Sequence, residues 1–312
     1  GLVLTFDSIA YSNSLGITSK FPRDSIAFKW SDELAETTLT DIEWNTSRTG
    51  RINPVAVFEP VDIEGSTVNR ASVHNVSVLE SLKLGVGDRI KVYKANMIIP
   101  QIAENLTCSA TAEIPKVCPV CGGETEIRSL REGAELYCTN PNCSAQRIKA
   151  LVHYVSRDAM NIEGLSEETI KKFADMGILN NYTDIYDIHS HTEIMEMDGF
   201  GKKSFDNLVE AIEKSKNVPL ENFINALGIN HVGLANAKLL CRHYNSDIES
   251  IVNADPVELS EIEGFGEVIA HSIHSYFDSR ENMELFNKAV SILNFTGQSE
   301  VGDKLAGITF VI

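Results

Sequence analysis

The chain has 312 residues, 43% of them hydrophobic and 23% charged, and a formal net charge of −17 at pH 7. This length allows two or more domains, the composition is ordinary for soluble globular protein, and the longest apolar stretches are far too short to span a membrane. Charge alone speaks against a nucleic acid partner, because affinity for phosphate grows with Lys and Arg contacts. Net charge does not set the field at one groove, so a DNA-binding hypothesis has to rest on local basic and amide-rich sites.

Both ends of the chain look cut. The first residue is Gly1 rather than Met, and residues 1–6 already have the pattern of a strand. A second apolar, strand-like run at residues 308–312 closes the chain. We find no signal peptide, and the thiols of Cys108 and Cys241 are isolated, so a reducing cytoplasm fits. We therefore expect a cytoplasmic chain that starts inside one domain and stops inside another.

The first third of the chain has the pattern of short strands. Residues 1–33 alternate apolar and polar segments and end with the run Ile26-Ala27-Phe28-Lys29-Trp30. Residues 36–115 are rich in β-branched residues and in Gly-containing turn signals. We expect strands at 37–45, 54–61, 66–73 and 89–95. About five short strands over roughly 80 residues predict a small barrel, for which the OB-fold is the natural candidate.

Four cysteines follow with the spacing Cys118-x2-Cys121-x16-Cys138-x4-Cys143. Each pair lies on a short turn that directs two sulfurs to one point, and four thiolates at about 2.3 Å in a tetrahedron are what structural zinc accepts. Two disulfides or buried free thiols are the alternatives, but paired cysteines in a chain without secretory features favour a metal. We recognise no further ligand in the sequence, so we expect a closed, structural Zn²⁺ site in a module over residues 116–146.

From residue 147 the pattern changes to helices with an internal repeat. Four glycine-containing hairpin signals, aligned on positions 164, 199, 231 and 264, recur every 32 to 35 residues. A period in this range indicates repeated supersecondary units. Each signal precedes an amphipathic segment, such as Lys202–Glu213. This is the helix-hairpin-helix pattern, and we expect an all-α domain over residues 147–298.

The glycines of such hairpins have a chemical role. They allow a tight turn and leave the backbone N–H groups at the start of the second helix open to a phosphate. The alternative is that they only cap helices, which is common for a single Gly turn and less convincing for four in phase. The first hairpin has Ser166 in place of its second glycine, and the third has His231 in place of its first. The second and fourth hairpins keep both glycines and are the expected DNA phosphate sites: Gly199 and Gly201, and Gly264 and Gly266.

The residues after these two hairpins differ in charge. Lys202 and Lys203 follow the second hairpin, where they add charge-assisted contacts to phosphate or simply form a solvated helix start. Glu267 follows the fourth hairpin, so binding there relies on backbone amides alone.

A strand ending in lysine, a small barrel, a four-cysteine module and four hairpin repeats, in this order, resemble the bacterial NAD-dependent DNA ligases. The resemblance implies a multidomain α+β protein with an OB-fold β-barrel, a four-cysteine zinc module and an all-α helix-hairpin-helix domain. Local motifs carry the same resemblance: residues 15–23 and 27–30 for the end of the adenylation domain, 48–50, 54–56, 59–61, 71–75, 87–90 and 98–101 for the OB domain, 226–233 for the third hairpin, and 305–311 for the opening of a BRCT domain.

This resemblance implies five parts: 1–33 from the adenylation domain, 34–115 as the OB domain, 116–146 as the zinc module, 147–298 as the helix-hairpin-helix domain and 299–312 as the start of a BRCT domain. The family seals nicks between a 5′-phosphate and a 3′-hydroxyl in DNA replication and repair, with NAD and Mg²⁺ as cofactors. Lys29 matches the motif lysine that contacts the adenylate phosphate, where its charge stabilises phosphoryl transfer. The lysine that accepts the nucleotide lies upstream, so this chain alone is expected to be inactive.

The resemblance also implies a partner. We expect a monomer that encircles nicked double-stranded DNA, with Arg48, Thr49 and Lys94 of the OB domain reaching the backbone. Contacts to phosphate position a protein without reading sequence, so binding should be sequence-independent. A bacterial, cytoplasmic and nucleoid-associated protein without a membrane partner is expected.

Three departures from the family pattern stand out. Thr5 occupies the position of a second family lysine, Asp24 that of a large aromatic residue, and Asn96-Met97 that of a Gly-acid pair. Thr5 and Asn96-Met97 motivate an alternative, a non-catalytic ligase-like clamp that binds nicks. A repair-nuclease scaffold is a more distant alternative, and the clustered carboxylates that metal-dependent cleavage needs are not recognised in the sequence.

Overall fold

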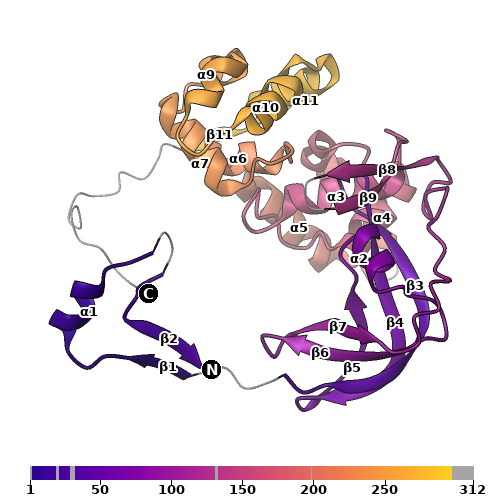
Figure 1. Cartoon of the computed structure of the whole chain (residues 1–312). Helices are drawn as coiled ribbons and strands as arrows, with labels where there is room; N and C mark the ends of the chain where they lie inside the picture. The colour runs from indigo at the N-terminus through magenta and orange to yellow at the C-terminus, as the bar shows by residue number, and fades with distance from the viewer. Residues whose placement is uncertain (1, 19–20, 29–31, 131–132, 198, 297–312) are drawn as a thin grey trace. The chain divides into compact units, whose positions relative to one another are not determined.

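The computed structural model describes residues 2–18, 21–28, 32–130, 133–197 and 199–296 (Figure 1). The chain divides into two compact units. Unit 1 comprises Gly1–Asn45, Ile52–Pro119 and Thr125–Tyr137, and unit 2 comprises Thr46–Arg51, Val120–Glu124 and Cys138–Ile312. Two short loops, at 46–51 and 120–124, therefore belong to the same unit as the helices. The five domain ranges expected from the sequence stay predictions.

Unit 1 opens with a two-stranded antiparallel sheet. Strands β1 (Leu2–Thr5) and β2 (Ser25–Phe28) pair with each other, and helix α1 (Ile9–Leu15) lies between them in the chain. These described elements contain no buried residue. The two strands expected in this region are confirmed, whereas Lys29 and the expected strand at 308–312 lie outside the described residues.

The larger sheet of unit 1 has seven strands: β3 (Ala35–Thr46), β4 (Arg51–Ile63), β5 (Ser66–Ser72), β6 (Arg89–Ala95), β7 (Ile99–Asn105), β8 (Thr125–Leu130) and β9 (Gly133–Cys138). Their hydrogen-bonded order is β7-β6-β3-β4-β9-β8, and β5 also pairs with β4. Among the described strands this order does not close on itself. That is compatible with an OB-fold, which is a partly open barrel.

The core of unit 1 follows from strand periodicity. Residues 51–58 of β4 alternate between half-buried and buried, which places Ile52, Ala56 and Phe58 inside. A short helix, α2 (Val76–Ser81), adds Leu79 to this core, and Asn75 starts that helix by accepting a hydrogen bond from the Val78 N–H. The apolar residues of the strands thus enclose one contiguous hydrophobic cluster.

Unit 2 is mainly helical. Its elements are α3 (Ser144–Val155), α4 (Glu167–Asp175), the 3-10 helices η1 (Tyr182–Ser190) and η2 (Thr192–Glu196), α5 (Lys202–Ser215), β10 (Asn217–Pro219), α6 (Leu220–Ala226), α7 (Leu234–His243), α8 (Ile248–Val252), α9 (Pro256–Glu261), α10 (Glu267–Asp278), α11 (Arg280–Ile292) and β11 (Asn294–Thr296). Strands β10 and β11 pair in parallel. One large hydrophobic cluster joins the helices. Within the described range, none of the helices combines the length and apolar character needed to cross a membrane.

The expected repeat is present in the backbone. Gly164, Gly199 and Gly264 have φ of 91°, 81° and 91°, and His231 at the equivalent position of the third repeat has φ of 64°. Each of these residues lies just before a helix, at the starts of α4, α5, α10 and α7. The left-handed conformation is therefore kept at all four positions, including the one where an L-residue replaces glycine at a steric cost.

Candidate nucleic-acid interface and metal centre

The second hairpin is the most open of the expected phosphate sites. Gly199 and Gly201 are exposed, and a Cβ added to either would meet no heavy atom within 4 Å. Gly201 is the N-cap of α5 and supplies no side chain to bind the first N–H groups of that helix. These amides carry the positive end of the helix dipole, so the turn presents an anion-binding surface.

The first hairpin lacks this opening. Ser166 is the N-cap of α4, and its hydroxyl accepts a hydrogen bond from the Thr169 N–H. A capping side chain of this kind satisfies one of the amides that a phosphate would use. The difference expected from the Gly-to-Ser exchange is therefore visible in the structure.

The two lysines of the second hairpin are at the surface. Lys202 pairs with Asp206 at 2.7 Å, both side chains being more than half exposed, and Lys203 is exposed too. An exposed i, i+4 ion pair contributes little stability and exchanges partners readily. Both ammonium groups are thus able to reach a phosphate beside the open amides.

The fourth hairpin has the same backbone and the opposite charge. Gly266 is the N-cap of α10, and a Cβ there would also meet no heavy atom within 4 Å. The segment 255–267 contains five carboxylates and neither Lys nor Arg. Repulsion between carboxylates and phosphate makes this hairpin the weaker of the two expected sites.

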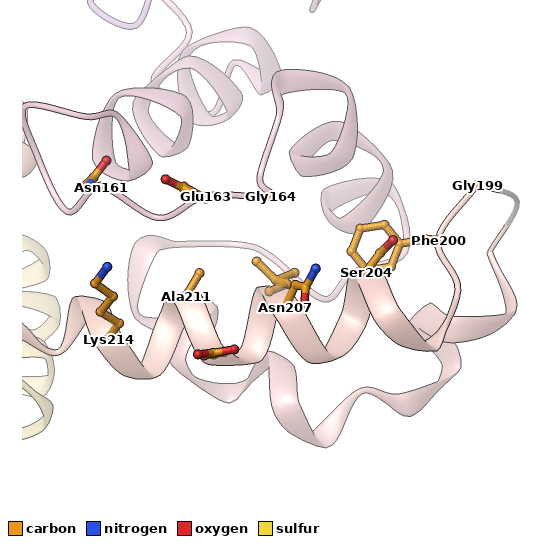
Figure 2. Close-up of a pocket in the computed structure, with 11 residues that line it drawn as sticks. Asn161, Glu163, Gly164, Gly199, Phe200, Ser204, Asn207, Ala211 and Lys214 are labelled. Carbon is orange, nitrogen blue, oxygen red and sulfur yellow. The ribbon is translucent and has the colours of Figure 1, made fainter.

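The first two hairpins open onto one groove, with a volume of about 590 Å³ (Figure 2). Glu163 and Gly164 lie on one side, Asn207 and Lys214 of α5 on the other, and Gly199 at one end. Acidic, basic and amide side chains line the groove together with apolar ones. Such a surface suits an extended polar polymer better than a small apolar ligand.

Arg48 and Thr49 lie in the turn between β3 and β4. The Nη1 atom of Arg48 donates a hydrogen bond to the Gly228 carbonyl oxygen at 2.6 Å, and the side chain is half-buried. Burial lowers the pKa of this guanidinium. Thr49 is exposed, with its hydroxyl 3.1 Å from that of Ser47. The turn therefore presents one fixed arginine and one exposed hydroxyl.

Lys94 does not lie at the surface, contrary to the expected contact with DNA. Its side chain is 5% exposed, and Nζ donates to the Ile63 carbonyl oxygen at 2.8 Å and to the Ser66 hydroxyl. The sequence contained the signal that was missed, because Lys94 shares the inward phase of β6 with Ile90 and Val92. In this conformation Lys94 supports the fold of unit 1 rather than a nucleic acid contact.

The four cysteines predicted to bind zinc come together. The Sγ atoms of Cys118, Cys121, Cys138 and Cys143 all lie within 4.8 Å of one another, and none is in a disulfide. Four sulfurs at about 2.3 Å from one zinc ion would be about 3.8 Å apart. The 3.6 Å between Cys121 and Cys138 is close to that edge length. Three of the cysteines are buried, as expected for a closed site.

The electrostatics of the cluster suit a metal. The Gly123 N–H and the Asn140 side chain bind the Cys121 sulfur and lower the pKa of that thiol to about 6. A thiol that ionises easily is a good zinc ligand, because zinc binds the thiolate. The backbone of Cys138 is also fixed, since its N–H donates to the Gly50 carbonyl oxygen at 2.8 Å.

Comparisons with known proteins agree with these features. A model of the NAD-dependent DNA ligase OB-fold domain matches residues 36–114, and a helix-hairpin-helix motif model matches residues 222–286. The DNA ligase of Lachnoclostridium phytofermentans is 54% identical over 315 residues, which cover 100% of this chain and 48% of that protein. The DNA ligase of Ruminiclostridium cellulolyticum is 53% identical over 282 residues, covering 90% of this chain and 43% of that protein. That of Carboxydothermus hydrogenoformans is 40% identical over 319 residues, covering 100% and 47%.

The chain belongs to the bacterial NAD-dependent DNA ligase family. It spans about half the length of the curated relatives that it matches. Family membership confirms the resemblance that the motifs indicated. The expected mixed α+β fold is confirmed as well, with an OB-fold, a cysteine cluster and helix-hairpin-helix repeats.

Thr5 and Asp24, two of the departures from the expected ligase pattern, are in contact with each other. The Thr5 hydroxyl donates to the Asp24 carboxylate at 3.4 Å, a long hydrogen bond. Hydrogen bonds from Ser12 and Ser25 lower the pKa of Asp24 further than the one from Thr5. Thr5, where the resemblance leads us to expect a lysine, thus faces the carboxylate of Asp24.

The third departure, Asn96-Met97, lies in a tight turn between β6 and β7. Asn96 and Met97 have φ of 54° and 63°, and the Met97 and Ile98 N–H groups donate back to Lys94 and Ala95. The tight turn that a glycine favours is therefore formed without one. Met97, Ile98 and Ile99 are exposed at its tip.

Proposed function

We propose that this chain is the DNA-binding part of an enzyme that seals nicks between a 5′-phosphate and a 3′-hydroxyl in duplex DNA, in replication and repair. NAD would supply the adenylate and Mg²⁺ would assist the phosphoryl transfer in the whole protein. One observation carries the proposal: a chain that is 54% identical to a DNA ligase holds an OB-fold match, a four-thiol cluster and in-phase hairpins together.

The parts would divide the work on DNA. The turn with Arg48 and Thr49 and the second hairpin with Gly199 and Gly201 would bind phosphates on the backbone. Such contacts fix register without reading bases, so we expect binding to nicked duplex of any sequence. The protein would act as a monomer on the nucleoid in the bacterial cytoplasm.

The thiolates of the cysteine cluster would hold one structural Zn²⁺ and brace the loops from which they come. A site filled by four thiolates has no open position for water or substrate. The hydrogen bond from the Cys138 N–H to the Gly50 carbonyl oxygen already fixes the backbone at one of these cysteines.

The test is nick sealing by the complete protein, with NAD and Mg²⁺, on a 5′-phosphorylated nicked duplex. Sealing supports the proposal. Nick binding without sealing would instead identify a clamp, an alternative that neither the family models nor the curated relatives favour.

The Thr5–Asp24 contact refines this experiment. A lysine introduced by Thr5→Lys would lie beside the Asp24 carboxylate and pair with it, which would weaken its action on a phosphate. The informative variant is therefore Thr5→Lys combined with Asp24→Trp, compared with each single change. If the wild-type protein does not seal nicks and the double variant does, the enzyme has lost activity at this pair.

A further inference from the structure

Two side chains bind carbonyl oxygens at the C-terminal end of α6. Arg48, 180 positions away in the sequence, donates to Gly228 at 2.6 Å, and Nε2 of His153 lies 2.7 Å from the Asn225 carbonyl oxygen. The last carbonyls of a helix lack intrahelical partners and carry the negative end of the helix dipole. The Gly228 carbonyl lies two residues beyond the end of α6, and the hydrogen bond fixes the guanidinium there.

Gly228 is a glycine for two physical reasons. Its φ of 68° is in the left-handed region, and an added Cβ would lie 2.8 Å from the Nη1 atom of Arg48. The clashing atom is the far end of a flexible side chain. A methyl group at position 228 would therefore displace the guanidinium, and the left-handed φ would add backbone strain.

The contact leaves Arg48 able to bind a second partner. A guanidinium has five N–H donors in a fixed fork, and the hydrogen bond to Gly228 uses one of its nitrogens. An arginine that is already half-buried and fixed loses less rotamer freedom on binding an anion than a free one does.

We propose that Gly228 is a positioning residue, whose carbonyl oxygen fixes Arg48 in the geometry that binds a DNA phosphate. The inference rests on the proposed function, in which the β3–β4 turn binds the DNA backbone. It adds a role for the third hairpin segment that requires no contact between Gly228 and DNA.

The experiment measures the affinity of the 312-residue chain for a nicked duplex of mixed sequence at several salt concentrations. Arg48→Ala should weaken binding about tenfold, the value of one charge-assisted hydrogen bond, and reduce the salt slope by about one. Gly228→Ala should reproduce the lower salt slope and weaken binding between about threefold and tenfold. In the Arg48→Ala background, Gly228→Ala should have no further effect on binding.

Gly177→Ala is the matched control. Gly177 also follows a helix C-cap, has φ of 77°, and an added Cβ there would meet no heavy atom within 4 Å. It should lower the melting temperature about as much as Gly228→Ala and leave DNA binding unchanged. Arg48→Lys should keep the salt slope of the wild-type chain and bind DNA with an affinity between those of the wild type and Arg48→Ala. An ammonium keeps the charge but lacks the planar, forked N–H donors of a guanidinium.

The outcomes separate the two proposals. If Arg48→Ala leaves binding unchanged, the proposed phosphate contact fails. If Arg48→Ala weakens binding while Gly228→Ala behaves like Gly177→Ala, only the positioning role fails. Tighter binding by Gly228→Ala would show that the carbonyl competes with DNA for Arg48, and additive losses in the double variant would show that Gly228 acts by another route; both overturn the inference.

Discussion

The Nζ atom of Lys94 lies 2.8 Å from the carbonyl oxygen of Ile63, and the lysine side chain is 5% exposed. A second hydrogen bond joins this ammonium to the hydroxyl of Ser66. The two partners lie at the end of β4 and the start of β5, so Lys94 links β6 to the adjoining hairpin. A buried ammonium is tolerated because polar atoms satisfy it.

Lys94→Ala should therefore affect stability more than DNA binding. The change leaves the Ile63 carbonyl without its donor and opens a cavity, and we expect the free energy of unfolding to fall by about 3 kcal/mol. Urea denaturation measures this loss. Lys91→Ala is the control, because Lys91 belongs to a partly exposed pair with Glu104 and should change stability by less than about 1 kcal/mol. Weaker DNA binding by Lys94→Ala at unchanged stability would restore the original DNA-contact hypothesis.

Replacing Cys118 with Ser should remove the metal. We expect the wild-type chain to bind about one zinc ion, and the variant to bind none and to melt at a lower temperature. Elemental analysis and thermal unfolding, each with and without a chelator, test this. Cys108→Ser is the control, because Cys108 is exposed and outside the cluster. Unchanged zinc content in Cys118→Ser would contradict the assignment.

Gly201→Val should weaken binding to nicked duplex by about tenfold, because a branched side chain would cover the open amides at the start of α5. The Gly201→Val change should lower the free energy of unfolding by about 1 kcal/mol, since Gly201 has φ of −81° and free space around it. Gly266→Val makes the same change at the acidic fourth hairpin and should weaken binding less. Equal effects of the two changes on affinity would argue against a phosphate site built on Lys202 and Lys203.

Met97→Gly should stabilise the β6–β7 turn. Met97 has φ of 63°, which an L-residue adopts at a cost, whereas glycine adopts it freely. After subtraction of the entropy that glycine loses on folding, we expect a gain of about 0.5–1 kcal/mol. Asn96→Gly should give a smaller gain, because Asn tolerates this conformation better than Met. Denaturant midpoints of the two variants decide the order.

His153 should make stability depend on pH. Burial lowers the pKa of this imidazole, the Asn225 carbonyl raises it and Arg48 lowers it again. Between the lowered folded-state pKa and the ordinary value of about 6.5, the unfolded chain binds a proton that the folded chain does not. Stability contributed by His153 is therefore present above about pH 6.5 and is lost as the pH falls through the folded-state pKa.

His153→Gln tests this dependence. Glutamine keeps an N–H donor for the Asn225 carbonyl but does not titrate. The wild-type chain should lose more stability than the variant when the pH is lowered from about 7 to about 5.5. Parallel curves for the two proteins would mean that other groups cause the pH dependence.

Local sequence was sufficient for several elements. The strand Arg89–Ala95 was predicted with its observed bounds, and the helix expected to start at Lys202 does so. The hairpin repeat was visible because a left-handed residue needs glycine or a tolerated substitute at a fixed position. The cysteine spacing likewise predicted the cluster of four thiols, since each pair lies on its own short turn.

Other elements depend on distant partners. Strand β7 (Ile99–Asn105) was not predicted as a strand; Pro100 is tolerated there because β7 lies at the edge of the sheet. The short helix Val76–Ser81 was missed too, since six residues provide little periodic signal and packing of Leu79 stabilises it.

The sequence by itself determined the family, the repeat and the four-cysteine cluster, because these are encoded in residue types at fixed local spacings. The tertiary structure decided where two predicted DNA contacts lie: Lys94 is directed into unit 1, and Arg48 is bound to Gly228. A flexible cation has no conformation of its own, so its position is set by whichever carbonyl or phosphate the fold brings within reach.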